Sequence, residues 1–204
     1  MTAGTDVAVT AERRPGRPRS AEAERAILAA ALEELAATGV DGFSVEAVAT
    51  RAGVGKTTIY RRWSNRDALI LDALSALDAE TQPRCKGVSA RDDLVSTLEV
   101  IRRRHRNSMH AQLLPRVLAA ARTHPELMRG YQERVIERRR EHIRGILRAG
   151  VASGELRADL DVELALKALV FPMLYAVMIR TEDTPLPKDF AASMVDLLMA
   201  GIGG

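Results

Sequence analysis

Apolar residues recur at steps of three and four positions along most of the chain, and no long run alternates apolar with polar residues. The first such stretch starts at Ser20, carries Ile27, Ala31 and Leu35 on one face, and ends at Gly39. This period is that of an amphipathic helix, and a glycine suits the end of one. Because the same period continues through the sequence, the pattern predicts an all-α fold.

The residues that follow predict short helices joined by tight turns, over 45–51, 56–63 and 65–79. Ser44 precedes the first of them and suits its N-cap, and Gly53 suits the sharp turn after it. Ser64 and Asp67 have the spacing of a capping box at the start of the last one. Helices this short are stable only when packed together, so we expect them to form a compact unit with the first helix.

Helical periodicity resumes after a segment with proline and glycine, residues 81–89, which predicts a linker. Pro125 suits the first turn of a long helix. Asp161 suits the N-cap of residues 162–179, a segment that is apolar on all sides and therefore requires burial on several of them. A last helix is expected over residues 188–200.

Positive charge is concentrated near the N-terminus, although 30 basic residues nearly balance 27 acidic ones over the whole chain. Residues 44–66 carry five basic side chains and one acidic one, and residues 13–19 carry four arginines and no acid. A local excess of this kind indicates an anionic partner more strongly than the net charge of +3 does.

The segment GVGKTT, residues 53–58, permits two interpretations. A phosphate-binding loop of a nucleotide-binding enzyme needs a glycine five positions before Gly55 and a buried strand upstream, but Thr50 stands there and the upstream spacing is helical. A helix-turn-helix needs a small residue where two helices cross and a glycine at the turn, which Ala49 and Gly53 provide. The second interpretation is therefore favoured.

Residues 43–69, FSVEAVATRAGVGKTTIYRRWSNRDAL, resemble the helix-turn-helix signature of the tetracycline-repressor (TetR) family of bacterial regulators. The resemblance implies an all-α protein with an N-terminal three-helix DNA-binding domain and a C-terminal helical domain for ligand binding and dimerisation. The implied parts are a flexible basic arm (residues 1–19), the DNA-binding domain (20–66), a connecting fourth helix (65–79) and the effector-binding and dimerisation domain (80–204).

The same resemblance implies the DNA contacts. Ser44 matches a hydroxyl residue that bonds a phosphate at the start of the second helix, and Arg66 matches a cation that holds another. Arg62 stands where many members have histidine, which adds a further phosphate contact. The positions that match the recognition helix, and so meet bases and backbone, are Lys56, Thr57, Thr58, Tyr60 and Arg61.

The arm contains RRPGRPR, which resembles the core of an AT-hook, a motif that lies along a narrow A·T minor groove. Arg17 and Arg19 are the expected contacts there. A disordered solubilising tail has a similar composition, so both interpretations of the arm stay open.

For the C-terminal domain the resemblance implies a homodimer, formed by the last two helices, that places two recognition helices on a near-palindromic double-stranded DNA operator. A small-molecule effector would release a repressor from that operator; activation also fits this architecture. The effector is expected to contact apolar residues of the last domain, namely Met109, Leu113, Phe171, Tyr175 and Met178. Two basic runs, 102–106 and 138–140, are ordinary solvated surface or an anion pocket.

No other chemistry is indicated. Cys85 is the lone cysteine, the histidines lack metal-ligand spacing, and no catalytic arrangement or cofactor motif is present. No signal peptide is evident, and the longest apolar run, residues 168–179, is too short to span a bilayer, so we expect a cytoplasmic protein without catalytic activity. A helical protein-interaction module is the remaining alternative.

Overall fold

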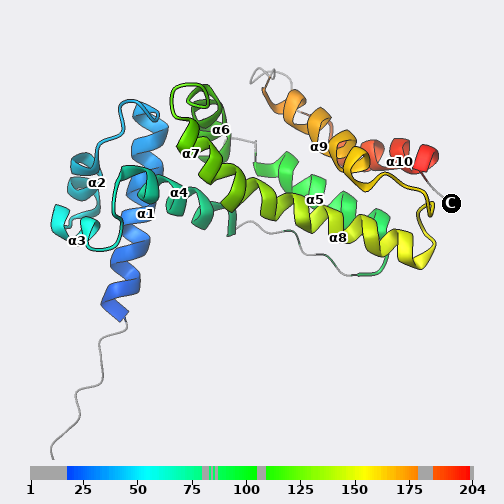
Figure 1. Cartoon of the computed structure of the whole chain (residues 1–204), viewed down its shortest axis with the longest axis horizontal. Helices are drawn as coiled ribbons and strands as arrows, with labels where there is room; N and C mark the ends of the chain where they lie inside the picture. The colour runs from blue at the N-terminus through cyan, green and yellow to red at the C-terminus, as the bar shows by residue number, and fades with distance from the viewer. Residues whose placement is uncertain are drawn as a thin grey trace, which may run out of the picture.

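The computed structural model describes residues 18–79, 83, 85, 87–104, 109–178 and 186–202. Within these ranges the chain forms helices and turns without a strand (Figure 1), which confirms the predicted all-α fold class. The elements in chain order are α1 (Pro18–Thr38), α2 (Val45–Ala52), α3 (Lys56–Tyr60), α4 (Arg66–Ala79), α5 (Ala90–Arg104), α6 (Met109–Ala119), α7 (Pro125–Tyr131), the π-helical turn η1 (Gln132–Ile136), α8 (Glu137–Ser153), α9 (Val162–Met178) and α10 (Phe190–Ile202).

Local signals place the ends of most helices where the sequence predicts them. The Ser44 hydroxyl accepts a hydrogen bond from the Ala47 N–H at 3.3 Å, which makes Ser44 the N-cap of α2. The Asp161 carboxylate accepts one from the Leu164 N–H at 3.0 Å and caps α9 in the same way. These two predictions are confirmed.

The predicted capping box of α4 is wrong. The Asn65 side chain, and not Ser64, accepts the hydrogen bond from the helix, with 2.8 Å between its Oδ1 and the Ala68 nitrogen. The reason is a difference of one residue in where the helix starts, since Arg66 is its first residue. The helix before it is also shorter than expected, because α3 ends at Tyr60 and turns follow.

The long helix predicted from Pro125 is present but changes its hydrogen bonding along the way. It runs through α7, the π-helical turn η1 and α8, and ends at Gly154, which has φ +78°. The α7 end lies close against α4, since a Cβ atom on Gly130 would be 2.6 Å from Leu71 Cδ1. The π-helical turn follows this contact directly.

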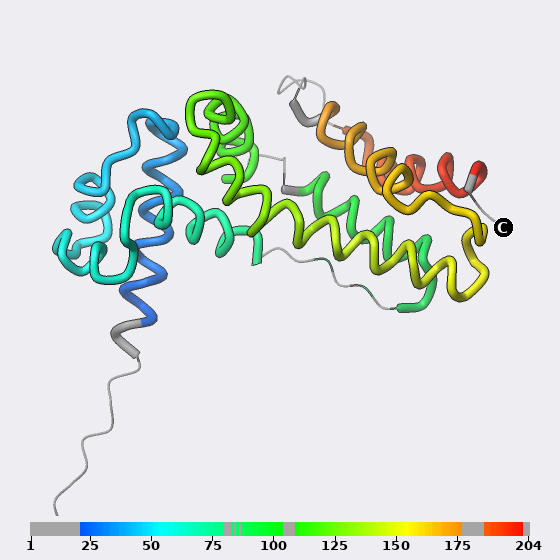
Figure 2. The backbone as a smooth tube through the Cα atoms, viewed as in Figure 1, coloured from blue at the N-terminus to red at the C-terminus, as the bar shows by residue number. Residues whose placement is uncertain are grey.

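Buried apolar residues form two cores. The first joins α1–α4 to α6, α7 and η1, and includes Ile27, Leu69 and Val117. The second joins α5, α8, α9 and α10, and includes Leu147 and Met173. Figure 2 shows α6 and α7 beside α4, between the N-terminal helices and the rest of the chain. The N-terminal unit therefore shares its core with two helices from beyond the linker.

No helix in the described part of the chain is both long and apolar enough to cross a membrane.

Candidate DNA interface and buried cavity

The turn between α2 and α3 is fixed by one left-handed residue and two backbone hydrogen bonds. Gly53 adopts φ +66°, a conformation that residues with a Cβ atom rarely adopt. Its N–H donates to the Thr50 carbonyl at 3.2 Å, and the Val54 N–H donates to the Ala49 carbonyl at 3.0 Å. The chain therefore turns sharply between α2 and α3, as in a helix-turn-helix.

One side of α3 is anchored and the other faces solvent. Ile59 is 1% exposed and packs in the first core, whereas Tyr60 is 54% exposed. The other predicted recognition residues are placed similarly, with Lys56, Thr57 and Arg61 exposed and Thr58 half-buried. Lys56 pairs with Glu46 of α2, while Arg61 makes no ion pair within the described part of the chain. The recognition face thus presents hydroxyl groups and an available guanidinium.

The other predicted phosphate contacts lie against the protein. Arg62 pairs with Glu24 of α1 at 3.4 Å. Arg66 donates to the Val40 carbonyl at 3.4 Å, approaches His124 Nδ1 at 3.5 Å, and pairs with its neighbour Asp67 at 3.3 Å. Their contacts with DNA remain predictions.

Only the last two residues of the predicted arm, 18 and 19, are among the described residues. Arg17 lies outside the described residues, and Arg19 belongs to the first turn of α1, so the helix starts slightly earlier than expected. The structure describes the backbone of Arg19 but not its side chain.

The GVGKTT segment does not have the setting of a phosphate-binding loop. It follows helix α2 where such a loop follows a strand, and it opens a helix of only five residues. The interpretation as a nucleotide-binding enzyme is therefore not favoured.

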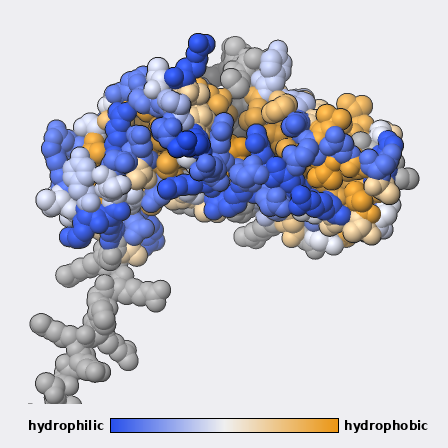
Figure 3. All heavy atoms as spheres, viewed as in Figure 1, coloured by the Kyte–Doolittle hydropathy of each residue, from blue (hydrophilic) through white to orange (hydrophobic). Residues whose placement is uncertain are grey.

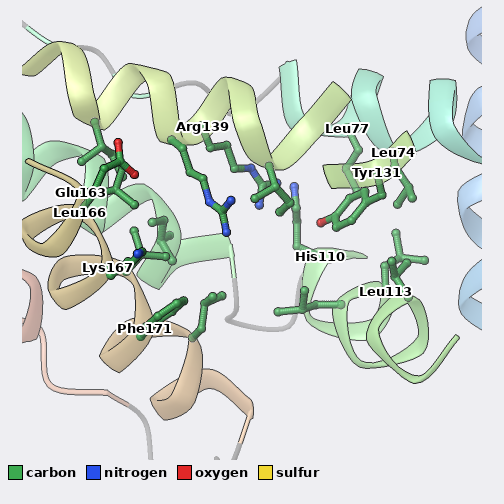
Figure 4. Close-up of a pocket in the computed structure, with 18 residues that line it drawn as sticks. Leu74, Leu77, His110, Leu113, Tyr131, Arg139, Glu163, Leu166, Lys167 and Phe171 are labelled. Carbon is green, nitrogen blue, oxygen red and sulfur yellow. The ribbon is translucent and has the colours of Figure 1, made fainter. Parts of the chain in front are cut away.

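A cavity of about 160 Å³ lies where the two cores meet (Figure 4). Its walls come from α4, α6 and α7 on one side and from α5, α8 and α9 on the other. Most of the lining is apolar, and the charged members come from α8 and α9. The lining residues are Leu74, Leu77, Ile101, His110, Leu113, Leu114, Val117, Tyr131, Ile136, Arg139, Arg140, Ile143, Glu163, Leu166, Lys167, Val170, Phe171 and Leu174.

The five residues predicted to contact the effector differ in where they lie relative to this cavity, and their contact with an effector remains a prediction. Leu113 and Phe171 line it. Met109 packs against the first core, and Tyr175 is 65% exposed and is not among the residues that line the cavity. The sequence does not separate Phe171 from Tyr175, because both are apolar residues on one side of α9 and its composition does not show where along the helix the cavity ends. The Met178 side chain lies outside the described residues.

Part of the charged lining comes from the basic run 138–140, for which the sequence permits ordinary solvated surface or an anion pocket; Glu163 and Lys167 carry no such local signal. Arg139 and Arg140 line the cavity, while Arg138 turns aside to pair with Asp78 at 3.0 Å. In the other basic run the structure describes the side chains of Arg102 and Arg103 only, and neither lines the cavity. Arg102 is buried and pairs with Glu99 at 2.6 Å.

A stripe of apolar side chains on α9 is exposed to solvent. Leu164, Phe171 and Tyr175 are all more than half exposed, and their spacing places them on one side of the helix. Leu197 of α10 is exposed as well. In the space-filling view, apolar side chains gather at the end of the molecule formed by α9 and α10 (Figure 3). An exposed apolar face of this kind marks a protein contact surface.

Comparison with known proteins identifies the family. Residues 27–73 match the family model for bacterial regulatory proteins of the tetR family, and residues 87–198 match the tetracyclin repressor-like C-terminal domain. An HTH-type transcriptional regulator of Bacillus subtilis, YdeS, is 31% identical over 82% of this chain and 84% of its own length. The DNA-binding transcriptional repressor TetR of Mycobacteroides abscessus is 37% identical over 73% of this chain and 76% of its own.

The fold agrees with this family. The crystal structure of the transcriptional regulator FadR from Bacillus subtilis, in complex with stearoyl-CoA, superimposes with a TM-score of 0.67 at 21% identity, covering 87% of this chain and 98% of that one. The helix-turn-helix geometry, the two matching family models and the relatives lead to one conclusion. The chain belongs to the TetR family of DNA-binding transcriptional regulators.

Proposed function

We propose that this regulator is a repressor that binds a near-palindromic operator as a two-fold homodimer and leaves it when a small molecule occupies the cavity. The observation that carries the proposal is the exposed face of α3. Tyr60, Thr57 and Arg61 face solvent on a helix whose opposite side is anchored by Ile59. A short helix presented in this way fits the major groove of duplex DNA.

The proposed contacts divide by role. Thr57, Tyr60 and Arg61 meet base edges and the adjoining backbone, because they are exposed and, unlike Lys56, make no ion pair within the described part of the chain. Ser44, Lys56, Thr58, Arg62 and Arg66 contribute phosphate contacts, with Lys56, Arg62 and Arg66 exchanging their present acidic partners for phosphates. Arg17 and Arg19 reach the neighbouring minor groove.

The dimer forms through α9 and α10. Burying the exposed stripe of Leu164, Phe171 and Tyr175 against a second copy removes apolar area from water. A two-fold axis through such an interface presents the same recognition helix twice, and the operator must then be nearly symmetric.

The cavity position supports release by an effector. It lies between the core that holds α1–α4 and the core that holds the proposed dimer helices. A molecule filling it changes how the two cores pack, and so changes the separation of the two recognition helices. Release then requires the effector to bind the non-operator state more tightly than the operator-bound state. Because operator DNA is cytoplasmic in bacteria, the proposal places the protein there.

The substitution Arg61→Ala tests the DNA interface. If Arg61 reads a base, operator affinity should fall by about 1–3 kcal/mol, measured by fluorescence anisotropy with a fragment selected from genomic DNA. Arg148→Ala on α8 is the matched control, since that arginine is also exposed but lies outside the interface. Equal operator affinities for the Arg61 variant and the unmodified protein would contradict the assigned role.

A further inference from the structure

The cavity has an apolar interior and a cationic rim. The interior walls include Leu74, Leu113 and Tyr131 from the first core. Along α8 and α9 the lining carries Arg139, Arg140 and Lys167, with Glu163 as the one carboxylate among the lining residues that the structure describes (Figure 4). Arg140 and Lys167 are exposed, so the positive charge lies toward solvent and the apolar surface lies deeper.

The carboxylate of this rim is already engaged. Glu163 accepts two hydrogen bonds from the Arg144 guanidinium, which does not line the cavity. These bonds hold the pKa of Glu163 below its ordinary value, so it stays ionised and paired with Arg144. It therefore offsets little of the charge that a ligand in the cavity would meet.

The cations retain free donors. Arg139 uses its Nε to bind the buried Asp78 carboxylate at 2.5 Å, which leaves both terminal nitrogens of its guanidinium without a hydrogen bond in the described part of the chain. Arg140 is 3.6 Å from Glu137, beyond hydrogen-bond distance. Lys167 makes no ion pair within the described ranges.

We infer that the effector is a monocarboxylate with a compact apolar body, either a single aromatic ring or a medium-length alkyl chain. Its carboxylate would sit between Arg140 and Lys167, and its body would fill the interior beside Leu113. The inference rests on the proposed role of the cavity as the effector site. A cavity of about 150 Å³ holds a benzene ring, and this one measures about 160 Å³.

Other ligand classes fit less well. A cationic ligand would meet three cations at the rim and one carboxylate that is already paired. A neutral ligand of the same shape would fill the interior, but the guanidinium and ammonium groups would then form hydrogen bonds with water and none with a charged ligand group. A carboxylate matches both the forked donors of arginine and the charge of lysine.

The test measures binding by calorimetry to the full-length protein without DNA, using octanoate and phenylacetate as probes. Octanamide and phenylacetamide are the matched neutral controls, and octanoyl-CoA is a third arm because its charge lies on the coenzyme. We expect each carboxylate to bind at least about tenfold more tightly than its amide. Equal affinities within each pair, tighter binding of an amide, binding of octanoyl-CoA alone, or no binding at all would each overturn the inference.

The variants Lys167→Gln and Arg140→Gln remove the rim charges without disturbing a core, because both side chains are exposed. Each should weaken carboxylate binding by about tenfold and leave amide binding unchanged. Arg148→Gln, an exposed cation on the same helix as Arg140 but outside the lining, is the control and should bind as the unmodified protein does. Unchanged carboxylate affinity in both rim variants would overturn the assignment.

A second readout separates this inference from the proposed function. Operator release is followed by anisotropy as carboxylate is added, and the midpoint of release should shift in the rim variants by the same factor as binding. If the carboxylate binds but the operator is not released, the carboxylate is a ligand of the cavity but not the effector. Failure to bind any operator, with tight carboxylate binding, would overturn the proposed function alone.

Discussion

At the residue scale, the DNA-binding unit depends on a few positions whose backbone or cap is specified locally. Ser44 and Gly53 set the two ends of α2, and both were predictable because their signals lie within a few residues of the helix they bound. The contacts of Arg66 were not predictable. Besides its neighbour Asp67, Arg66 contacts Val40, 26 residues away, and His124, 58 residues away in the loop before α7, and no local pattern indicates the two distant neighbours.

Gly53→Ala should destabilise the protein by about 1–2 kcal/mol, because an alanine at φ +66° suffers backbone strain even though open space surrounds the position. The measurement is the free energy of unfolding in urea. Gly145→Ala is a matched control, since Gly145 lies inside α8 with open space around it. There alanine should stabilise by up to about 1 kcal/mol through helix propensity. A neutral Gly53 variant would argue against a turn that requires a left-handed residue.

Arg66→Ala should lower affinity for any duplex DNA and reduce the slope of log K against log salt by about one, if Arg66 exchanges Asp67 for a phosphate. The same loss of affinity with an unchanged slope would show that Arg66 acts only as a brace between Val40 and His124. Titrations of a random-sequence duplex at several salt concentrations decide between these two roles.

At the element scale, hydrophobic periodicity predicted nearly every helix but not which face of each helix meets which neighbour. The clearest case is α9. Its apolar residues serve the second core, the cavity and the solvent-exposed stripe, and the sets overlap. Leu166 belongs to the core and lines the cavity, and Phe171 lines the cavity and belongs to the stripe. Because all three sets are equally apolar, composition could not separate them. The sequence likewise shows that Met109 and Tyr175 are apolar, but it does not show which part of the protein each side chain meets.

Charge placement also depends on how the elements pack. Arg138 and Arg139 of α8 both bind Asp78, which is fully buried at the end of α4. A buried carboxylate is stable when it is paired in this way. These two ion pairs link α4, the last helix of the DNA-binding unit, to α8, which carries Arg139 and Arg140 of the cationic rim.

The double substitution Leu164→Glu and Tyr175→Glu should convert the proposed homodimer to a monomer, because it places charges on the apolar stripe of α9. Sedimentation velocity measures the change, and operator affinity should fall at least a hundredfold as the two half-sites lose their linkage. Val88→Glu is the control, since Val88 is 75% exposed but lies before α5. A variant that stays dimeric would place the interface elsewhere.

At the scale of the whole molecule, the two cores determine how a ligand could act at a distance. The first core includes α6 and α7 as well as the DNA-binding helices, so the cavity wall formed by Leu113 and Tyr131 is part of the same packed unit as α2 and α3. The loop before α7 adds a polar contact, with His124 Nε2 2.7 Å from Asp41 Oδ1. A change in the cavity is thereby connected to the turn that precedes α2.

This arrangement was only partly accessible from the sequence. The fold class and the helix-turn-helix follow from residue spacing, and the family follows from the resemblance of residues 43–69 to a known signature. The cavity joins residues from Leu74 to Leu174, which are adjacent only after the two cores have packed. Its cationic rim appears in the sequence as two adjacent arginines and a lysine far beyond them, without any local sign that they converge.

The most direct test of the account is a footprint of the full-length protein on fragments selected from the genomic DNA of its source. We expect one dimer on a near-palindromic site, with two protected major-groove segments about 34–36 Å apart or somewhat more, and both segments should need a higher protein concentration for protection in the Arg61→Ala variant. Selection of no specific fragment, or protection of a single asymmetric segment that Arg61→Ala leaves unchanged, would contradict it.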